Sequence, residues 1–282
     1  MKTDRMRPVS LFAAATLPFV FTTILLLPPS LQAQSPPKGI DPKLLTKAAA
    51  GDASSQTAVG LAYAGGDGVP QDYAKAAEWL GKAADQDNAI AQAALGLLYY
   101  AGRGVPKDYN KAAILYRRAA EQGISKAQLS LGNLYLDGQG VPVDYGQAMA
   151  WFRKAADQGD AEAEYSLALL YDDGKGVPQD TAQAITWYRK AAEQGLSFAQ
   201  INLGLILFAN AGDRQRAVEE AYFWLDVAAA RTNDSHTQQA ASKARDEVAS
   251  QLLPFQLKRT QKKAETWIVE HPTSALTMYS PH

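Results

Sequence analysis

A short phrase containing glycine, valine and proline recurs along this chain at a fixed interval. Its valines are Val69, Val105, Val141 and Val177, and successive copies lie 36 residues apart. A constant period in this range is typical of repeat arrays, in which each unit contacts only its neighbours. The spacing therefore predicts a row of similar units, and most of the chain either belongs to a unit or ends the row.

The unit at Ser125–Gly159 shows how each repeat is expected to fold. Leu131 and Tyr135 lie four residues apart, so they fall on one stripe of a helix. Gly138 can end that helix in the left-handed conformation, and Asp144 is a suitable N-cap for a second helix. Each helix pair then has an apolar side that it cannot bury alone, so several units must stack.

Tyrosines recur at one position of the repeat, at Tyr99, Tyr135 and Tyr171. Their spacing is the same 36 residues as that of the valines. Because every unit needs the same packing at this position, we predict that these side chains belong to the core.

The repeated pattern is A-x-x-x-L-G-x-x-Y-x-x-G-x-G-V-P-x-D-Y, followed by A-x-x-W-[FY]-x-K-A-A-x-Q-G. It resembles the Sel-1-like repeat family, a relative of the tetratricopeptide repeats, over roughly residues 44–230. The resemblance implies an all-α fold: an α/α solenoid, in a right-handed superhelix, of about five helix-turn-helix repeats of 36 residues plus a C-terminal capping helix pair. It also implies a role as a scaffold or adaptor for other proteins.

The N-terminus has the features of a targeting segment. Basic residues precede an apolar run from Leu11 to Leu27, and Ala33 is a suitable small residue for cleavage. We predict a secretory signal peptide over residues 1–33, although the run is nearly long enough to remain as an uncleaved anchor. The predicted location is therefore periplasmic or secreted, with anchoring in the inner membrane as the alternative.

The remaining boundaries follow from changes in the pattern. The Gly-Val-Pro phrase is missing after Phe208, so the array is expected to begin closing there. We predict a Pro-rich linker at 34–42, the repeat solenoid at 43–230, capping helices at 231–270 and a flexible tail at 271–282.

Composition excludes several classes of function. The chain has no cysteine, so disulfides and thiolate metal sites are impossible, and its formal net charge of −1 argues against a nucleic-acid partner. The three histidines, His236, His271 and His282, lie outside the repeats and lack zinc-site spacing. No nucleophile elbow or phosphate-binding loop is present. We therefore predict no catalytic residue, metal or cofactor, and a protein that is not an enzyme.

A partner-binding stripe can be read from the helical register. By analogy with tetratricopeptide repeats, the first helix of each pair lines the concave face. A step of 100° per residue from the core position of Leu131 then places a second stripe opposite the core. The predicted partner-binding residues are Tyr100, Leu129, Asn133, Tyr165, Leu169, Asp172, Ile201, Leu205 and Phe208. The alternative is that adjacent first helices pack together and bury much of this stripe.

Three functions remain open at this point. The first is a scaffold in the bacterial cell envelope that binds an unidentified protein or peptide on its concave face. The second is an exported hydrolase acting on cell-wall or β-lactam-like substrates, and the third is a structural element of an envelope assembly that binds through the capping helices. A membrane would be a partner only if the N-terminal segment is not cleaved. The missing catalytic groups favour the scaffold.

Overall fold

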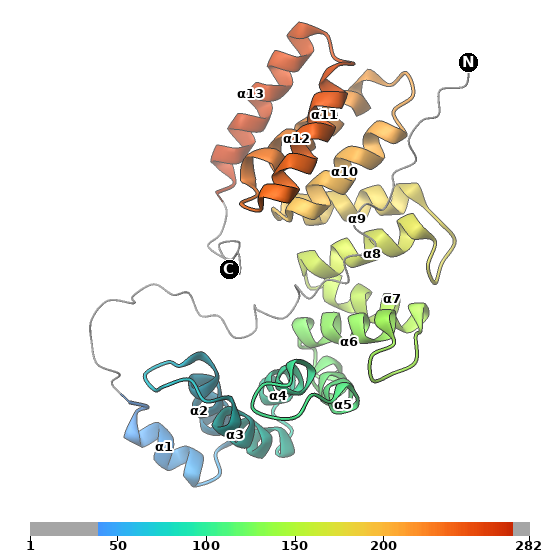
Figure 1. The fold of residues 1–282 in the computed structure, drawn as a ribbon. Coiled ribbons are helices and arrows are strands. Elements are labelled where there is room, and N and C mark those ends of the chain that lie inside the picture. Colours follow the sequence, from blue (N-terminus) through green and yellow to red (C-terminus); the bar gives the residue numbers. More distant parts are fainter. Residues whose placement is uncertain (1–38, 273–282) are drawn as a thin grey trace. The chain divides into compact units, whose positions relative to one another are not determined.

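The computed structural model describes residues 39–272, which form helices and contain no strand (Figure 1). The predicted signal peptide, most of the linker and tail residues 273–282 lie outside the described residues. The chain divides into two compact units, whose described parts are residues 39–160 and 161–272. Within each unit, helices that follow one another in the sequence pack together, except that α13 packs mainly on α11 and not on α12. The predicted all-α solenoid is confirmed.

The first unit begins with one extra helix and continues with three helix pairs. Its helices are α1 (Pro42–Ala49), α2 (Ala53–Gly65), α3 (Tyr73–Asp85), α4 (Ala89–Ala101), α5 (Tyr109–Glu121), α6 (Ser125–Asp137) and α7 (Tyr145–Ala156).

The second unit contains two more helix pairs and the two helices predicted after the repeats. Its helices are α8 (Ala161–Asp173), α9 (Thr181–Glu193), α10 (Ser197–Ala209), α11 (Gln215–Arg231), α12 (Ser235–Ala249) and α13 (Pro254–Glu270). Both α12 and α13 pack against α11.

An aspartate at the end of each repeated phrase joins the two helices of a pair. The carboxylate of Asp108 accepts a hydrogen bond from the backbone N–H of Lys111 at 3.0 Å, which caps α5. The N–H of Asp108 donates to the carbonyl of Tyr99 in α4 at 2.9 Å. Asp72, Asp144 and Asp180 make equivalent contacts, and the predicted N-cap role of Asp144 is confirmed. Capping of this kind contributes about 1 kcal/mol for each helix.

The largest fully buried side chains come from one position of the second helices. Tyr116 in α5, Phe152 in α7 and Tyr188 in α9 each have 0% exposure. Burial of a side chain of this size contributes roughly 1.5–3 kcal/mol.

The sequence analysis assigned the recurring tyrosines of the first helices to the core, but the structure buries these side chains only in part. Tyr99, Tyr135 and Tyr171 are half-buried. The Lys111 ammonium lies 5.0 Å from the ring centroid of Tyr99, and Arg117 donates to the Tyr135 hydroxyl. A phenol at the edge of the core keeps its polar end accessible to a cation or to water, which explains this placement.

A ladder of buried glutamines runs through the repeats. Gln128, which is 4% exposed, donates from its amide nitrogen to the carbonyl of Ala120 at 3.0 Å. Its amide oxygen accepts from Gln158, 30 residues later, at 2.8 Å. Gln56 and Gln92 make the same two contacts in earlier repeats. Each ladder glutamine adds a second hydrogen bond to a carbonyl near the end of the preceding helix, and that carbonyl also accepts from a backbone N–H three residues later.

The ladder ends inside the second unit. Glu164 takes the place of the glutamine there and accepts from Gln194 at 2.8 Å. Gln200 still donates to the carbonyl of Ala192 at 3.1 Å, but its amide oxygen has no hydrogen-bond partner among residues 39–272. The buried positions of α9 recur in α11 after 37 residues, so Arg231 holds the position equivalent to Gln194, and its guanidinium donates to the carbonyl of Ile268 instead.

Candidate functional site

The nine predicted partner-binding residues differ in their burial. Leu129 is 0% exposed, Ile201 is 2% exposed and Tyr165 is 6% exposed. These three side chains are covered by neighbouring parts of the protein and belong to the core. A partner could not reach them. The other six are half-buried: Tyr100, Asn133, Leu169, Asp172, Leu205 and Phe208. The alternative of packing between helices is thus correct for a third of the stripe.

Four of the half-buried residues lie on the two first helices of the second unit. Leu169 and Asp172 are three residues apart on α8, so they share one helix face. Leu205 and Phe208 hold the equivalent positions on α10, 36 residues later. We call these four side chains the α8/α10 patch. It presents three apolar groups and one carboxylate.

A polar network holds the carboxylate of the patch. The Tyr188 hydroxyl in α9 donates to Asp172 at 3.3 Å. The side-chain amide of Asn202 in α10 donates to the Tyr165 hydroxyl at 3.2 Å and to the Tyr188 hydroxyl at 3.5 Å. The rings of Tyr165 and Tyr188 lie 5.8 Å apart at their centroids. This network joins α8, α9 and α10 directly beneath the patch.

Burial dominates the electrostatics of this network. It raises the pKa of Asp172, and Asp173 adds to the effect while the hydrogen bond from Tyr188 opposes it. Burial also raises the pKa of Tyr165 to about 12, and it raises the pKa of Tyr188 well above the usual value. Both phenols therefore stay protonated at neutral pH. The Tyr188 hydroxyl donates to Asp172, and the Tyr165 hydroxyl accepts from Asn202.

The first unit has a related arrangement around Tyr116. Burial raises the pKa of Tyr116 well above its usual value, while Tyr100 lies close enough to add to this shift. The rings of Tyr100 and Tyr109 meet edge to face, with centroids 5.2 Å apart. Asn133 lies half-buried on α6. The sequence analysis did not single out Tyr116 and Tyr188, the second-helix phenols next to these predicted residues.

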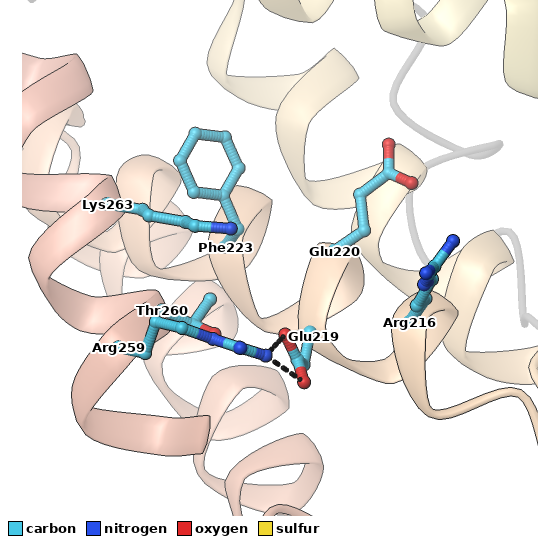
Figure 2. Close-up of a pocket in the computed structure, with 7 residues that line it drawn as sticks. All are labelled: Arg216, Glu219, Glu220, Phe223, Arg259, Thr260 and Lys263. Atoms are coloured by element: carbon cyan, nitrogen blue, oxygen red, sulfur yellow. Dashed lines mark hydrogen bonds and ion pairs between the residues drawn. The ribbon is translucent and has the colours of Figure 1, made fainter. Parts of the chain in front are cut away.

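A groove between α11 and α13 was not expected from the sequence. It has two adjoining parts, of about 400 Å³ and 490 Å³. We call it the capping groove, and its lining residues are Arg216, Glu219, Glu220, Phe223, Arg259, Thr260, Lys262, Lys263, Thr266, Trp267 and Glu270. Figure 2 shows Arg259 reaching from α13 to Glu219 on α11. The groove exists only because α11 and α13 pack together, and the paired residues Glu219 and Arg259 are 40 residues apart in the sequence.

Two other kinds of feature, a metal-binding cluster and a membrane-spanning helix, are not found in residues 39–272. No cluster of three or more acidic or histidine side chains could hold a metal ion there. None of the helices in this range combines the length and the apolar run needed to cross a bilayer.

The paired helices, the repeated caps and the glutamine ladder define the class of protein. This is a helical-repeat protein of the α/α solenoid type. The Sel1 repeat profile matches five consecutive segments, residues 53–88, 89–124, 125–160, 161–196 and 197–233. The chain belongs to the Sel1 repeat family. The matched repeats begin at the first residue of α2, so α1 precedes them, and they include the fifth unit, which lacks the Gly-Val-Pro phrase.

The chain is also similar to solved structures. A Sel1 repeat protein from Oxalobacter formigenes is 30% identical, with a TM-score of 0.65, over 79% of this chain and 91% of that one. The protective antigen c5321 of uropathogenic Escherichia coli, which displays an SLR fold, is 26% identical over 85% and 74% of the two chains, with a TM-score of 0.38. No match was found among curated proteins. Sel1 repeat proteins generally mediate protein–protein interactions, and their scaffolds are typically non-catalytic.

Proposed function

We propose that this protein is a non-enzymatic scaffold of the bacterial cell envelope that binds a protein or peptide at the α8/α10 patch. The general role of the family in protein–protein interaction supports the class of function. The N-terminal sequence pattern supports export to the periplasm or outside the cell, with a membrane anchor as the alternative.

The observation that carries the proposal is the partial exposure of two pairs of equivalent positions next to a hydrogen-bonded network. Leu169, Leu205 and Phe208 offer apolar surface without being fully packed into the core. Asp172 offers a carboxylate that Tyr188 already orients by a hydrogen bond. Rigid side chains of this kind lose little conformational freedom on binding, which favours their use as contact points.

The chemistry of the patch defines the expected ligand. An apolar side chain of the partner would pack against Phe208 and the two leucines. A basic or polar group next to it would approach Asp172, with Asp173 adding negative charge nearby. The proposed ligand is therefore a peptide segment with an apolar residue beside a basic or polar one.

The hydrolase alternative gains no support from the histidines. His236 and His271 belong to the region after the repeats, and the ring of His271 stacks on Trp267 with a centroid distance of 4.3 Å.

Photo-crosslinking in living cells tests the proposal. A photoreactive amino acid at Leu205 should capture a discrete partner, while the same group at Thr186, an exposed position on α9, should not. The crosslink should be lost in Asp172→Lys and Phe208→Asp backgrounds that retain the wild-type helical signal. Crosslinks that persist unchanged in both backgrounds would exclude the patch as the binding site. Cell fractionation of the same samples tests the proposed location.

A further inference from the structure

The capping groove has chemistry opposite to that of the α8/α10 patch. Phe223 lies on the α11 side of the groove, and Thr260 and Trp267 lie on the α13 side. Its rim carries charged residues of both signs, and the state of each charge decides what the groove can bind.

The two α11 carboxylates that line the groove, Glu219 and Glu220, are already paired within the protein. Both oxygens of Glu219 accept from Arg259, at 2.8 and 2.7 Å, and Gln256 donates to the same group at 3.0 Å. Glu220 accepts two hydrogen bonds from Arg189, at 3.1 and 2.7 Å. These carboxylates have little remaining capacity to attract a cationic ligand.

Three cations of the groove have no such pairing. Arg216, Lys262 and Lys263 are exposed, and none of them forms an ion pair within residues 39–272. Lys263 lines both parts of the groove. With Glu219 and Glu220 neutralised internally, the groove presents an excess of positive charge to a ligand, and Glu270 at one end is the remaining carboxylate.

The apolar surface of the groove is held rigidly. The Trp267 ring packs edge to face on Trp224 and Phe223, with centroid distances of 5.5 and 6.2 Å. The Arg231 guanidinium lies 4.6 Å from the same ring and donates to the carbonyl of Ile268 at 2.9 Å. An aromatic side chain fixed by its neighbours is the usual anchor of a binding surface.

One buried polar group next to the groove lacks a hydrogen-bond partner. Thr260 is 2% exposed, and its hydroxyl has no hydrogen-bond partner among residues 39–272. An unsatisfied buried hydroxyl is unusual, because most buried polar groups find a partner.

We propose that the capping groove is a docking site for an acidic peptide segment of a partner protein. Carboxylates of the segment would pair with Arg216, Lys262 and Lys263, and a single apolar side chain between them would pack on Phe223 and the edge of Trp267. Charge complementarity selects this occupant, because the free charges of the groove are mainly positive. The site is separate from the α8/α10 patch, which favours a basic or polar ligand.

Fluorescence polarisation with designed peptides and the purified protein tests this proposal. The probe is a fluorescein-labelled peptide with glutamates on both sides of a single central leucine, and its control has lysines in place of the glutamates. The glutamate peptide should bind at least about tenfold more tightly than the lysine peptide, and its affinity should fall as salt is raised.

Matched charge reversals locate the binding. Lys263→Glu should weaken binding of the glutamate peptide about tenfold or more, whereas Lys243→Glu, an exposed site on α12 with the same change in net charge, should leave it unchanged. Phe223→Ala should also weaken it, with circular dichroism showing that the helices remain. Equal binding of both peptides, or equal loss in both charge variants, would overturn the proposal. Self-association abolished by Lys263→Glu would instead identify a second copy as the occupant and also overturn it.

Discussion

A methyl group on Gly104 would lie 2.2 Å from the carbonyl carbon of Tyr73. The loop between α4 and α5 therefore rests directly on the backbone at the start of α3, in the preceding helix pair. Gly140 stands in the same relation to Tyr109, because a methyl group on Gly140 would lie 2.3 Å from the carbonyl carbon of Tyr109. The second glycine of the repeated phrase is thus required by stacking between units as well as by the bend of its own loop.

Gly104→Ala should destabilise the protein by about 3 kcal/mol or more, since steric overlap adds to the strain of a side chain at a φ of 70°. Gly123→Ala is the matched control, because Gly123 has a φ of 91° and no atom near an added methyl group. That variant should lose only about 1–2 kcal/mol. Urea unfolding followed by circular dichroism measures both, and equal losses would show that the contact with Tyr73 is not important.

The glutamine ladder should contribute measurably to stability. Gln128→Leu would remove the hydrogen bonds that Gln128 makes with the Ala120 carbonyl and the Gln158 amide, so we expect a loss of about 1–3 kcal/mol. Gln147→Leu, at an exposed position on α7, should change the free energy of unfolding by less than about 0.5 kcal/mol. Urea titrations of both variants provide the comparison. A similar small effect at both sites would contradict a structural role for the ladder.

The Tyr188 hydroxyl should be coupled to Asp172. Position 152 shows that a phenylalanine fits the equivalent site, since Phe152 is fully buried there. Tyr188→Phe should therefore keep the packing and lose about 1–2 kcal/mol through the missing hydrogen bond. A double-mutant cycle with Asp172→Ala isolates this interaction in urea unfolding. A coupling energy near zero would mean that the contact does not contribute.

The raised pKa of Asp172 predicts a pH dependence of defined sign. The folded state holds the proton of this carboxyl to higher pH than the unfolded state, whose pKa is about 3.9. Wild-type protein should therefore gain stability relative to Asp172→Asn as pH falls from 7 through the folded pKa, and the gain should be complete below about pH 4.

The N-cap Asp72 should behave in the opposite way. Hydrogen bonds from Lys75 lower the pKa of Asp72, so its contribution is present above the unfolded pKa, about 3.9. The advantage of wild-type protein over Asp72→Asn should disappear as pH falls through the folded pKa. Urea midpoints measured between pH 3 and 7 compare the two pairs. Parallel curves for Asp72 and Asp172 would contradict both assignments.

Much of the fold could be predicted because its signals are local. A glycine that ends a helix and an aspartate that begins the next act within a few residues, so Gly138 and Asp144 could be assigned from sequence spacing. The stripe of candidate residues was less predictable. Periodicity gives the direction of a side chain but not what covers it, so Leu129 and Phe208 received the same prediction although only Leu129 is buried.

The sequence by itself determined the repeat length, the helix pairs, the caps and the family, because these depend on residues close together in the chain. The tertiary structure decided which positions remain accessible and which groups meet. The contact of Gly104 with Tyr73, the network around Tyr188 and the capping groove each join residues from different helices. Such contacts depend on the angle and depth at which helices pack, and a one-dimensional period does not contain that information.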